Sequence, residues 1–272
     1  MFDLPQDYNE AAKDSLRGTS TALPCPYPAP EMYWRNGDST FATVNEIQDA
    51  RRFGGWGVNK EAMSDLPVPP DWILFEGLVG KASGETYDAY MTRSVWAAPI
   101  VRRWRWNDYT NRGEVQYLCY MAHIENKVAK PWGMVILSAK SLDTKVLDGL
   151  FAKFKSATAE ARGNAAPNFF YHPLGTFGPK PVYETRGKGN KTSQVTPPQL
   201  YIPAAGFTPE LMQTVFVGKD IAAEIVAAIK NPALIEWAAE WNNKKKAEEG
   251  PQVGNFDAAN NAFQAVDDNP FA

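Results

Sequence analysis

Short apolar runs bounded by proline, glycine or asparagine occupy residues 31–139, and they limit the possible fold more than any other feature of the chain. Runs of this kind, rich in β-branched and aromatic residues, are typical of strands. The clearest cover 72–79, 94–106, 114–124 and 132–137. The second and third flank the turn-rich segment 107–113, so we expect them to pair as a hairpin with a long loop.

The hydrophobic period changes after residue 140. Apolar residues then recur at spacings of three and four, which predicts an amphipathic helix from the N-cap candidate Ser141 to Gly163. Residues 168–202 return to short apolar segments. A second helical region covers 209–249, with expected interruptions at Gly218 and at Asn231-Pro232, because glycine and proline both weaken helices.

These elements predict a mainly β fold with added helices, of the α+β class. Short strands, a late helix and long polar loops fit an OB-fold-like five-stranded barrel with long insertions and C-terminal helices. An unrelated α+β sheet is the alternative. Along the chain, we expect an extended N-terminal arm with alternating prolines over 1–30, an OB-like body over 31–205, a helical segment over 206–249 and a disordered acidic tail over 250–272.

Several classes of protein are disfavoured by the residues present. No apolar run approaches the roughly 18 residues of a membrane span. The N-terminal residues carry acids where a signal peptide needs bases, so we expect a cytoplasmic protein with no membrane partner. The two cysteines, Cys25 and Cys119, and the two histidines, His123 and His172, lack the paired spacing of a zinc site. We therefore expect no metal and no cofactor.

Catalytic motifs are also weak. Residues 187–192 look superficially like a phosphate-binding loop, but Asn190 and Glu184 stand where that motif requires glycine. Asp108 and Glu114 could hold a metal ion in a nuclease, but the lysine that usually follows such a pair is missing. We expect no catalytic residues and no enzymatic activity.

Charge is distributed unevenly along the chain. The net charge is −3, but Lys246 is the last basic residue, and five acids follow it. Residues 1–246 therefore carry +2, with 28 bases and 26 acids, beside a tail of −5. An acidic tail beside a basic body is typical of an interaction tail on a polyanion-binding protein.

The clearest binding chemistry of the body lies in Arg102-Arg103-Trp104-Arg105-Trp106. In a strand, alternate side chains share a face, so residues 102, 104 and 106 would face one side and residues 103 and 105 the other. Indoles stack on bases and guanidinium groups contact phosphates, as single-stranded nucleic acid requires. In the alternative interpretation, the tryptophans belong to the core and the arginines form a solvated face.

Two further segments combine bases with aromatic residues. Arg51 and Arg52 precede Trp56, which glycines surround, so that a ligand could approach the backbone closely. Residues 180–191 contain Tyr183 and four bases, Lys188 and Lys191 among them, and read as a mobile basic hairpin loop. Tyr109 lies in the loop after the first segment and is a further stacking candidate. In the alternative interpretations, the segment around Trp56 is a glycine-rich turn and residues 180–191 are an ordinary solvated loop.

The chain ends in Asp267-Asp268-Asn269-Pro270-Phe271-Ala272. This arrangement resembles the acidic C-terminal tip of bacterial and phage single-stranded-DNA-binding proteins, the SSB family, in a divergent phage or mobile-element form similar in design to T7-type phage proteins. The resemblance is specific only over these residues and implies that Asp267, Asp268, Pro270 and Phe271 bind partner proteins. Family tips usually end on the phenylalanine, whereas Ala272 follows it here. A frayed acidic terminus is the alternative.

Together these features predict sequence-independent binding of single-stranded DNA in replication, recombination and repair. The acidic tip would recruit replication or recombination proteins, in the host cytoplasm if the protein is encoded by a phage. The alternatives are a single-strand annealing recombination protein and a structural or interaction protein that does not bind DNA. The apolar residues after Pro209 could pack on the body or form the seam of a homo-oligomer.

Overall fold

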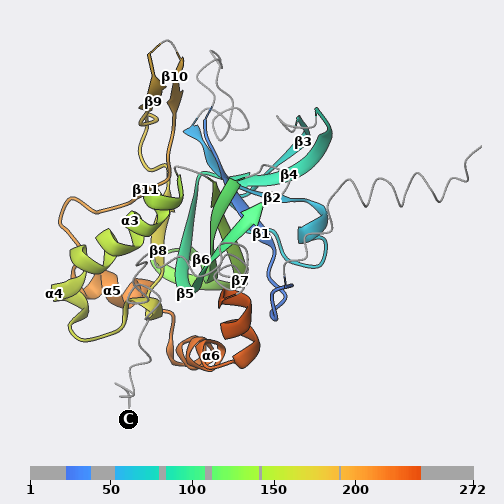
Figure 1. The fold of residues 1–272 in the computed structure, drawn as a ribbon. Coiled ribbons are helices and arrows are strands. Elements are labelled where there is room, and N and C mark those ends of the chain that lie inside the picture. Colours follow the sequence, from blue (N-terminus) through green and yellow to red (C-terminus); the bar gives the residue numbers. More distant parts are fainter. Residues whose placement is uncertain are drawn as a thin grey trace, which may run out of the picture.

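The computed structural model describes residues 23–37, 53–79, 84–107, 112–140, 143–189 and 191–239. Predictions for residues 1–22, Arg51, Arg52, Tyr109 and the acidic tail lie outside these residues. Within them the fold is mixed α+β, as expected, with a large and mostly antiparallel sheet and few helices (Figure 1).

The main sheet has nine strands in the described residues, in the order β11-β8-β5-β6-β7-β1-β2-β4-β3. Every pairing is antiparallel except that of β1 with β7, which is parallel. The strands are β1 (Glu31–Arg35), β2 (Gly55–Asn59), β3 (Ile73–Val79), β4 (Thr86–Thr92), β5 (Ser94–Asn107), β6 (Arg112–Glu125), β7 (Val128–Lys140), β8 (His172–Gly175) and β11 (Gln199–Leu200). The remaining two, β9 (Glu184–Lys188) and β10 (Lys191–Val195), form a separate hairpin.

The long strands β5, β6 and β7 form the centre of the sheet, and the predicted β5–β6 hairpin is confirmed. The β6–β7 connection is a two-residue turn in which Asn126 and Lys127 both have positive φ, of 50° and 63°. Two positive φ values in such a turn match the twist of the strands that it joins. Strand β5 has a register shift between Pro99 and Val101, where proline offers no backbone donor to the ladder.

The prediction of a five-stranded barrel is not borne out, because the described sheet is larger and is not closed. The sheet curls strongly, so that the Trp56 indole on β2 donates to the Leu174 carbonyl on β8 at 3.2 Å. However, no ladder among the described residues joins β2 to β5 or β8. The single sequence could not show this, because runs such as 55–59 and 86–92 are too polar or glycine-rich to stand out as strands.

The helices follow the predicted pattern with one difference. The expected helix over 141–163 is split at Thr158 into α3 (Asp143–Ala157) and α4 (Ala159–Arg162). The expected interruptions at Gly218 and Asn231 are confirmed, since they separate α5 (Pro209–Val215), α6 (Lys219–Ile229) and the helical residues 232–239. Thr208 caps α5 by accepting from the Leu211 amide at 3.3 Å. Two short 3₁₀ helices, η1 (Glu61–Met63) and η2 (Pro167–Phe169), complete the described elements.

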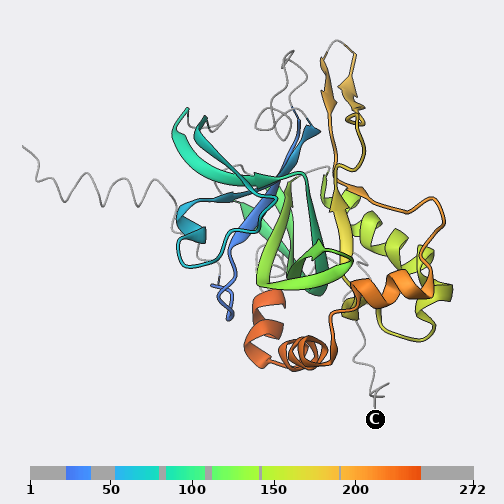
Figure 2. The same ribbon diagram turned by 180° about the vertical axis from the view of Figure 1, so that it is seen from behind.

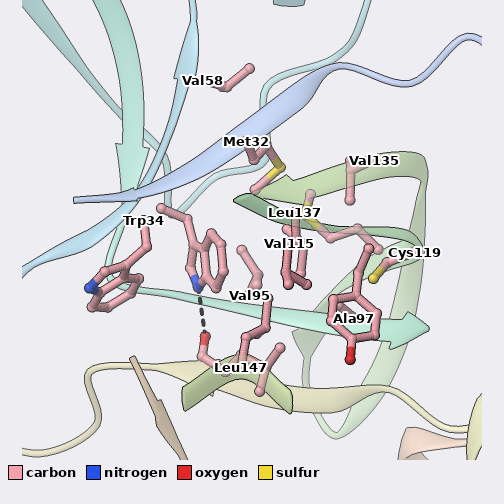
Figure 3. Packing of buried hydrophobic residues seen from close by; sticks show 14 of the residues in the cluster. Met32, Trp34, Val58, Val95, Ala97, Val115, Cys119, Val135, Leu137 and Leu147 are labelled. Carbon is pink, nitrogen blue, oxygen red and sulfur yellow. Dashed lines mark hydrogen bonds between the residues drawn. The ribbon is translucent and has the colours of Figure 1, made fainter. Parts of the chain in front are cut away.

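Apolar side chains fill both sides of the curled sheet. On the concave side they come from β1, β2, β5, β6, β7 and α3, including Met32, Trp34, Val115, Leu137 and Leu147 (Figure 3). On the convex side, Ile100 and Leu118 pack with Trp237 and with apolar residues of α5 and α6. No helix in the described part of the chain has both the length and the apolar character needed to cross a membrane.

Candidate nucleic-acid interface

The alternation predicted for β5 is confirmed for the residues whose side chains are described. Arg102 lies opposite Tyr117 and Trp104 lies opposite Val115 on the concave face. The Arg102 guanidinium lies 5.0 Å from the centre of the Trp104 ring. Trp104 is 37% exposed, whereas Trp34, Trp56 and Trp237 are buried. Trp104 is therefore a tryptophan of the body that offers a ring to solvent.

Arg102 on β5 forms an ion pair with α3. Its guanidinium donates to both carboxylate oxygens of Asp148 on α3, at 2.9 and 2.8 Å, and the Tyr117 hydroxyl donates to the same carboxylate. Burial and the neighbouring Asp148 raise the pKa of Tyr117 well above its usual value, so the phenol stays protonated. Because the Nε–Nη2 edge of its guanidinium already binds Asp148, Arg102 is a weaker candidate for a phosphate contact than the sequence suggests.

Arg103 and Arg105 lie on the opposite face, as predicted, but inside a polar network. Arg103 is only 6% exposed, donates to the Gln116 amide oxygen at 2.8 Å and lies 4.0 Å from the Trp237 ring centre. Arg105 donates to Glu31 at 3.3 Å. Burial and these hydrogen bonds make Arg103 a poor candidate for the predicted phosphate contact, because a guanidinium that leaves such partners must leave their acceptors unpaired.

Trp56 is not accessible for the predicted stacking on a base, because its ring lies inside the core. Its side chain is fully buried, and its ring meets Trp34 edge-on at 5.4 Å. The adjacent glycines allow the chain to approach itself rather than a ligand. A Cβ on Gly54 would lie 2.6 Å from the Thr196 hydroxyl, and one on Gly55 would lie 2.4 Å from the Thr92 carbonyl oxygen.

The predicted basic hairpin loop forms the β9–β10 hairpin, which projects from the body on the side away from α6 (Figures 1 and 2). Lys188 and Lys191 are directly opposite each other beside the turn. Arg186 forms an ion pair with Glu184 at 3.1 Å, Tyr183 is half-buried and Lys180 is exposed. Like charges directly opposite each other destabilise a strand pair, so an anionic ligand would stabilise this tip.

The base of the β9–β10 hairpin is held by the body at two points. On one side, the Thr196 carbonyl accepts from the Trp34 indole at 2.8 Å, and the Thr196 hydroxyl accepts from the Gly37 amide. On the other side, Arg93 donates to the Gly178 carbonyl at 2.8 Å and lies 4.1 Å from the Phe53 ring centre. Arg51 and Arg52 directly precede Phe53 in the sequence, although they lie outside the described residues.

Trp104 and the hairpin base are related through the sheet register. Trp104 pairs with Val115, and Val115 pairs with Ala139. The β1–β7 ladder pairs Tyr33 with Ser138, and Trp34 is the next residue of β1. Adjacent strands lie about 4.8 Å apart, so β5 and β1 are about 15 Å apart measured along the curled sheet. The Trp34 indole on β1 holds the hairpin base.

Two aromatic groups near the hairpin were missed by the sequence interpretation. Phe177 and Tyr201 pack with ring centres 5.1 Å apart beside the hairpin base, and Tyr201 is 41% exposed. Arg35 lies 5.1 Å from the ring centres of both Tyr33 and Tyr87. The run Tyr33-Trp34-Arg35 was a signal that could have identified this second group, whereas Phe177 and Tyr201 meet only in the fold.

Trp106, Lys188 and Lys191 lie on described strands, but the positions of their side chains are not described. Among the described residues, no group of three histidine, cysteine or acidic side chains could hold a metal ion. The structure thus leaves the rings of Trp104 and Tyr201 exposed, with Tyr201 next to the start of β5 and Trp104 toward its other end, and it buries Trp56 and Arg103.

Comparisons with protein-family models, with characterised protein sequences and with solved structures find no match to this chain.

Proposed function

We propose that this protein binds single-stranded DNA, without sequence preference and without a chemical step. The observation that supports the proposal most strongly is the projecting β9–β10 hairpin, which has two lysines in register at its tip. Two like charges beside the turn of an arm that the body holds at its base contribute little to folding. A phosphate backbone supplies the negative charge that such an arm can bind.

In the proposed mechanism, charge and stacking come from different elements. Lys180, Lys188 and Lys191 of the hairpin region neutralise phosphates, with Arg51 and Arg52 as further candidates from the sequence. Trp104 and Tyr201 stack on bases, because their rings are exposed to solvent. Stacking on an aromatic ring stabilises binding by about 1–3 kcal/mol per base and accepts any base.

We also propose that the curled sheet is a divergent, open relative of the OB barrel. The β2 edge approaches β8 through the hydrogen bond from Trp56 to Leu174, and α3 covers the concave side through Leu147 and Phe151. These contacts support a barrel-like curl, which single-strand-binding OB folds use to present a groove. The resemblance of the tip to SSB proteins supports a role for Asp267, Asp268, Pro270 and Phe271 in recruiting partners.

Titration with oligo-dT tests the proposal through the intrinsic tryptophan fluorescence. We expect quenching at low salt, a loss of affinity as salt rises, and much weaker quenching in Trp104→Phe. A DNA duplex of the same length serves as the control and should bind more weakly. Absence of quenching by oligo-dT at low salt, together with unchanged anisotropy of a labelled oligonucleotide, would contradict DNA binding and favour a structural protein.

A strand-annealing assay separates the proposed function from the annealing alternative. A protein that only binds single strands should slow the pairing of two complementary oligonucleotides, because it covers their bases. An annealing protein should accelerate it under the same conditions of salt and protein concentration.

A further inference from the structure

A small pocket lies at the end of β5 and β6 that is remote from Trp104. Its volume is about 180 Å³, and it forms where the loop before β3 meets the start of β5 and the end of β6. The side chains that bear on its chemistry are Asp71, Trp72, Trp96, Met121, His123 and Glu125. Drug-sized ligand sites are usually larger, about 300–1,000 Å³, so this pocket suits a group of side-chain size.

The pocket is negatively charged, although residues 1–246 as a whole are mildly basic. Its lining residues include the acids Asp71 and Glu125 but no lysine or arginine. Lys130 pairs with His123 across β6 and β7 but is not part of the lining. Trp72 and Trp96 add the aromatic surfaces that attract cations most strongly.

Two acceptors in the lining have capacity for a ligand. The Asp71 carboxylate accepts from the Thr92 hydroxyl through Oδ2 at 3.1 Å, which leaves its other oxygen for a donor. His123 Nδ1 is buried and has no hydrogen-bond partner within the described residues, and it can accept an N–H in the tautomer that carries the ring proton on Nε2. A buried polar atom without a partner is costly, so a ligand that donates N–H groups would be stabilised here.

The loop that forms the rim is held in place without a ligand. The Trp132 indole donates to the Pro67 carbonyl at 2.6 Å, and the Trp72 amide donates to the Pro69 carbonyl at 3.1 Å. Pro69 and Pro70 further restrict the backbone. A rim of this kind loses little conformational entropy when a ligand binds.

We propose that this pocket binds an organic cation with N–H donors, namely a guanidinium or primary ammonium group. The two carboxylates balance its charge, the tryptophans face its cationic carbon or nitrogen, and the free acceptors receive its N–H groups. A metal ion fits less well, because the acidic and histidine side chains described do not converge as ligands. The cation can be a free amine or the arginine or lysine side chain of a partner protein.

Butylguanidinium and its uncharged analogue butylurea are the probes that test this proposal. Binding is followed through the Trp72 and Trp96 indole signals in ¹H–¹⁵N spectra of the full chain. We expect saturable shifts with butylguanidinium, with a Kd of about 1 mM, and no saturable shifts with butylurea. Equal responses to the two probes, or none to either, would overturn the proposal.

Matched carboxamide variants locate the site. Asp71→Asn retains an acceptor for Thr92, and we expect it to weaken butylguanidinium binding at least about fivefold; Glu125→Gln should act in the same direction. Glu76→Gln removes an exposed carboxylate outside the pocket and should leave the Kd unchanged. Loss of binding in Glu76→Gln to the same extent would show non-specific attraction and contradict the site.

A second set of probes distinguishes the two sources of the cation. If the source is a side chain of a partner, the blocked tripeptide acetyl-Gly-Arg-Gly-amide should bind at least as tightly as butylguanidinium. If the source is a free amine, the tripeptide should be excluded while putrescine binds. Either result supports the pocket, whereas exclusion of both probes contradicts it.

Discussion

At the scale of single residues, neighbours of the same chemical type have opposite roles because strand alternation sends them to different faces. Arg102 and Trp104 face the concave side, where Arg102 is paired with Asp148 and Trp104 stays exposed. Arg103, between them, is buried against Gln116 and Trp237. On residue type alone, all three would be predicted to contact a ligand. In the fold, Trp104 is the one of the three whose side chain is both exposed and not held in an ion pair or buried network.

Replacing Trp104 with alanine should weaken binding of oligo-dT about 10-fold or more, because one stacking platform is lost. The change should affect the free energy of unfolding little, since the ring is already 37% exposed. Anisotropy of a labelled oligonucleotide and urea unfolding measure the two effects. Trp56→Phe is the matched control and should show the reverse, with lower stability because the buried indole donates to Leu174. Equal DNA affinity of Trp104→Ala and the parent would exclude Trp104 from the site.

His172 makes stability depend on pH. It is buried between Phe154, with ring centres 3.8 Å apart, and Phe151, and its Nε2 donates to the Pro167 carbonyl. Burial lowers the pKa of His172 to about 3, while the usual value is 6.5. Between these values the unfolded chain binds a proton that the folded chain excludes. Stability contributed by neutral His172 is therefore complete above about pH 6.5 and is lost as the pH falls toward 3.

This effect can be measured by urea unfolding at pH 7 and pH 5. In the parent protein, His172 should account for a loss of up to about 2 kcal/mol between these pH values. His172→Phe keeps the ring stacking and should remove that share of the pH dependence, although it also removes the bond to Pro167. An unchanged difference between pH 7 and pH 5 in this variant would show that other groups cause it.

At the scale of elements, α3 is held on the sheet by both apolar packing and the Arg102–Asp148–Tyr117 cluster. Asp148→Asn removes the charge that Arg102 pairs with and one acceptor of the Tyr117 hydroxyl. Because Asp148 is partly exposed, we expect a moderate loss of about 1–2 kcal/mol in the free energy of unfolding. Glu184→Gln in the exposed Arg186 pair is the control and should have a smaller effect. Equal effects in urea unfolding would contradict a clamping role.

The β9–β10 hairpin is the element that carries the proposed contact with phosphates. The double change Lys188→Gln and Lys191→Gln removes two charges that lie opposite each other. It should weaken binding of oligo-dT and reduce the slope of log K against log salt by about 1.4, since a single strand contributes about 0.7 per neutralised phosphate. Folding should not suffer, because like charges are removed.

The β6–β7 turn offers a matched control for the hairpin variant. Lys127→Gln and Lys130→Gln remove the same charge at the opposite end of β6 and β7 from Trp104. If binding depends only on net charge, both double variants should lower the salt slope equally. If the hairpin has a specific role, only the double change at Lys188 and Lys191 should lower the salt slope.

At the scale of the whole molecule, local patterns identified the elements better than their assembly. The β5–β6 hairpin and the helix breaks at Gly218 and Asn231 follow from residue patterns within one segment. So does the basic hairpin, which was predicted over 180–191 and has its strands over 184–195. The nine-strand sheet depends on pairings between distant segments, such as β1 with β7, that no local pattern encodes. Burial of Trp56 has the same origin, since its ring packs with residues of several distant strands and donates to the Leu174 carbonyl on β8.

The unequal charge of body and tail leads to a prediction for the full chain. Deleting residues 250–272 removes Asp257, Asp267 and Asp268 and changes the net charge from −3 to 0. Charge on the protein alters association with a polyanion over about a Debye length, 10 Å at 0.1 M salt. The truncated protein should therefore bind oligo-dT with equal or higher affinity at low salt, and the difference should vanish at high salt.

Recruitment of partners should respond to the same deletion in the opposite way. The two acids and Phe271 of the tip are the proposed recognition group, so the truncated protein should no longer retain replication or recombination proteins that the full chain retains. Phe271→Ala keeps the charge of the tail and separates the two effects, because it should lose the partners without changing the salt dependence of DNA binding. A truncation that loses DNA binding would contradict this separation, since it would place the DNA contacts in the tail rather than in the hairpin and the sheet.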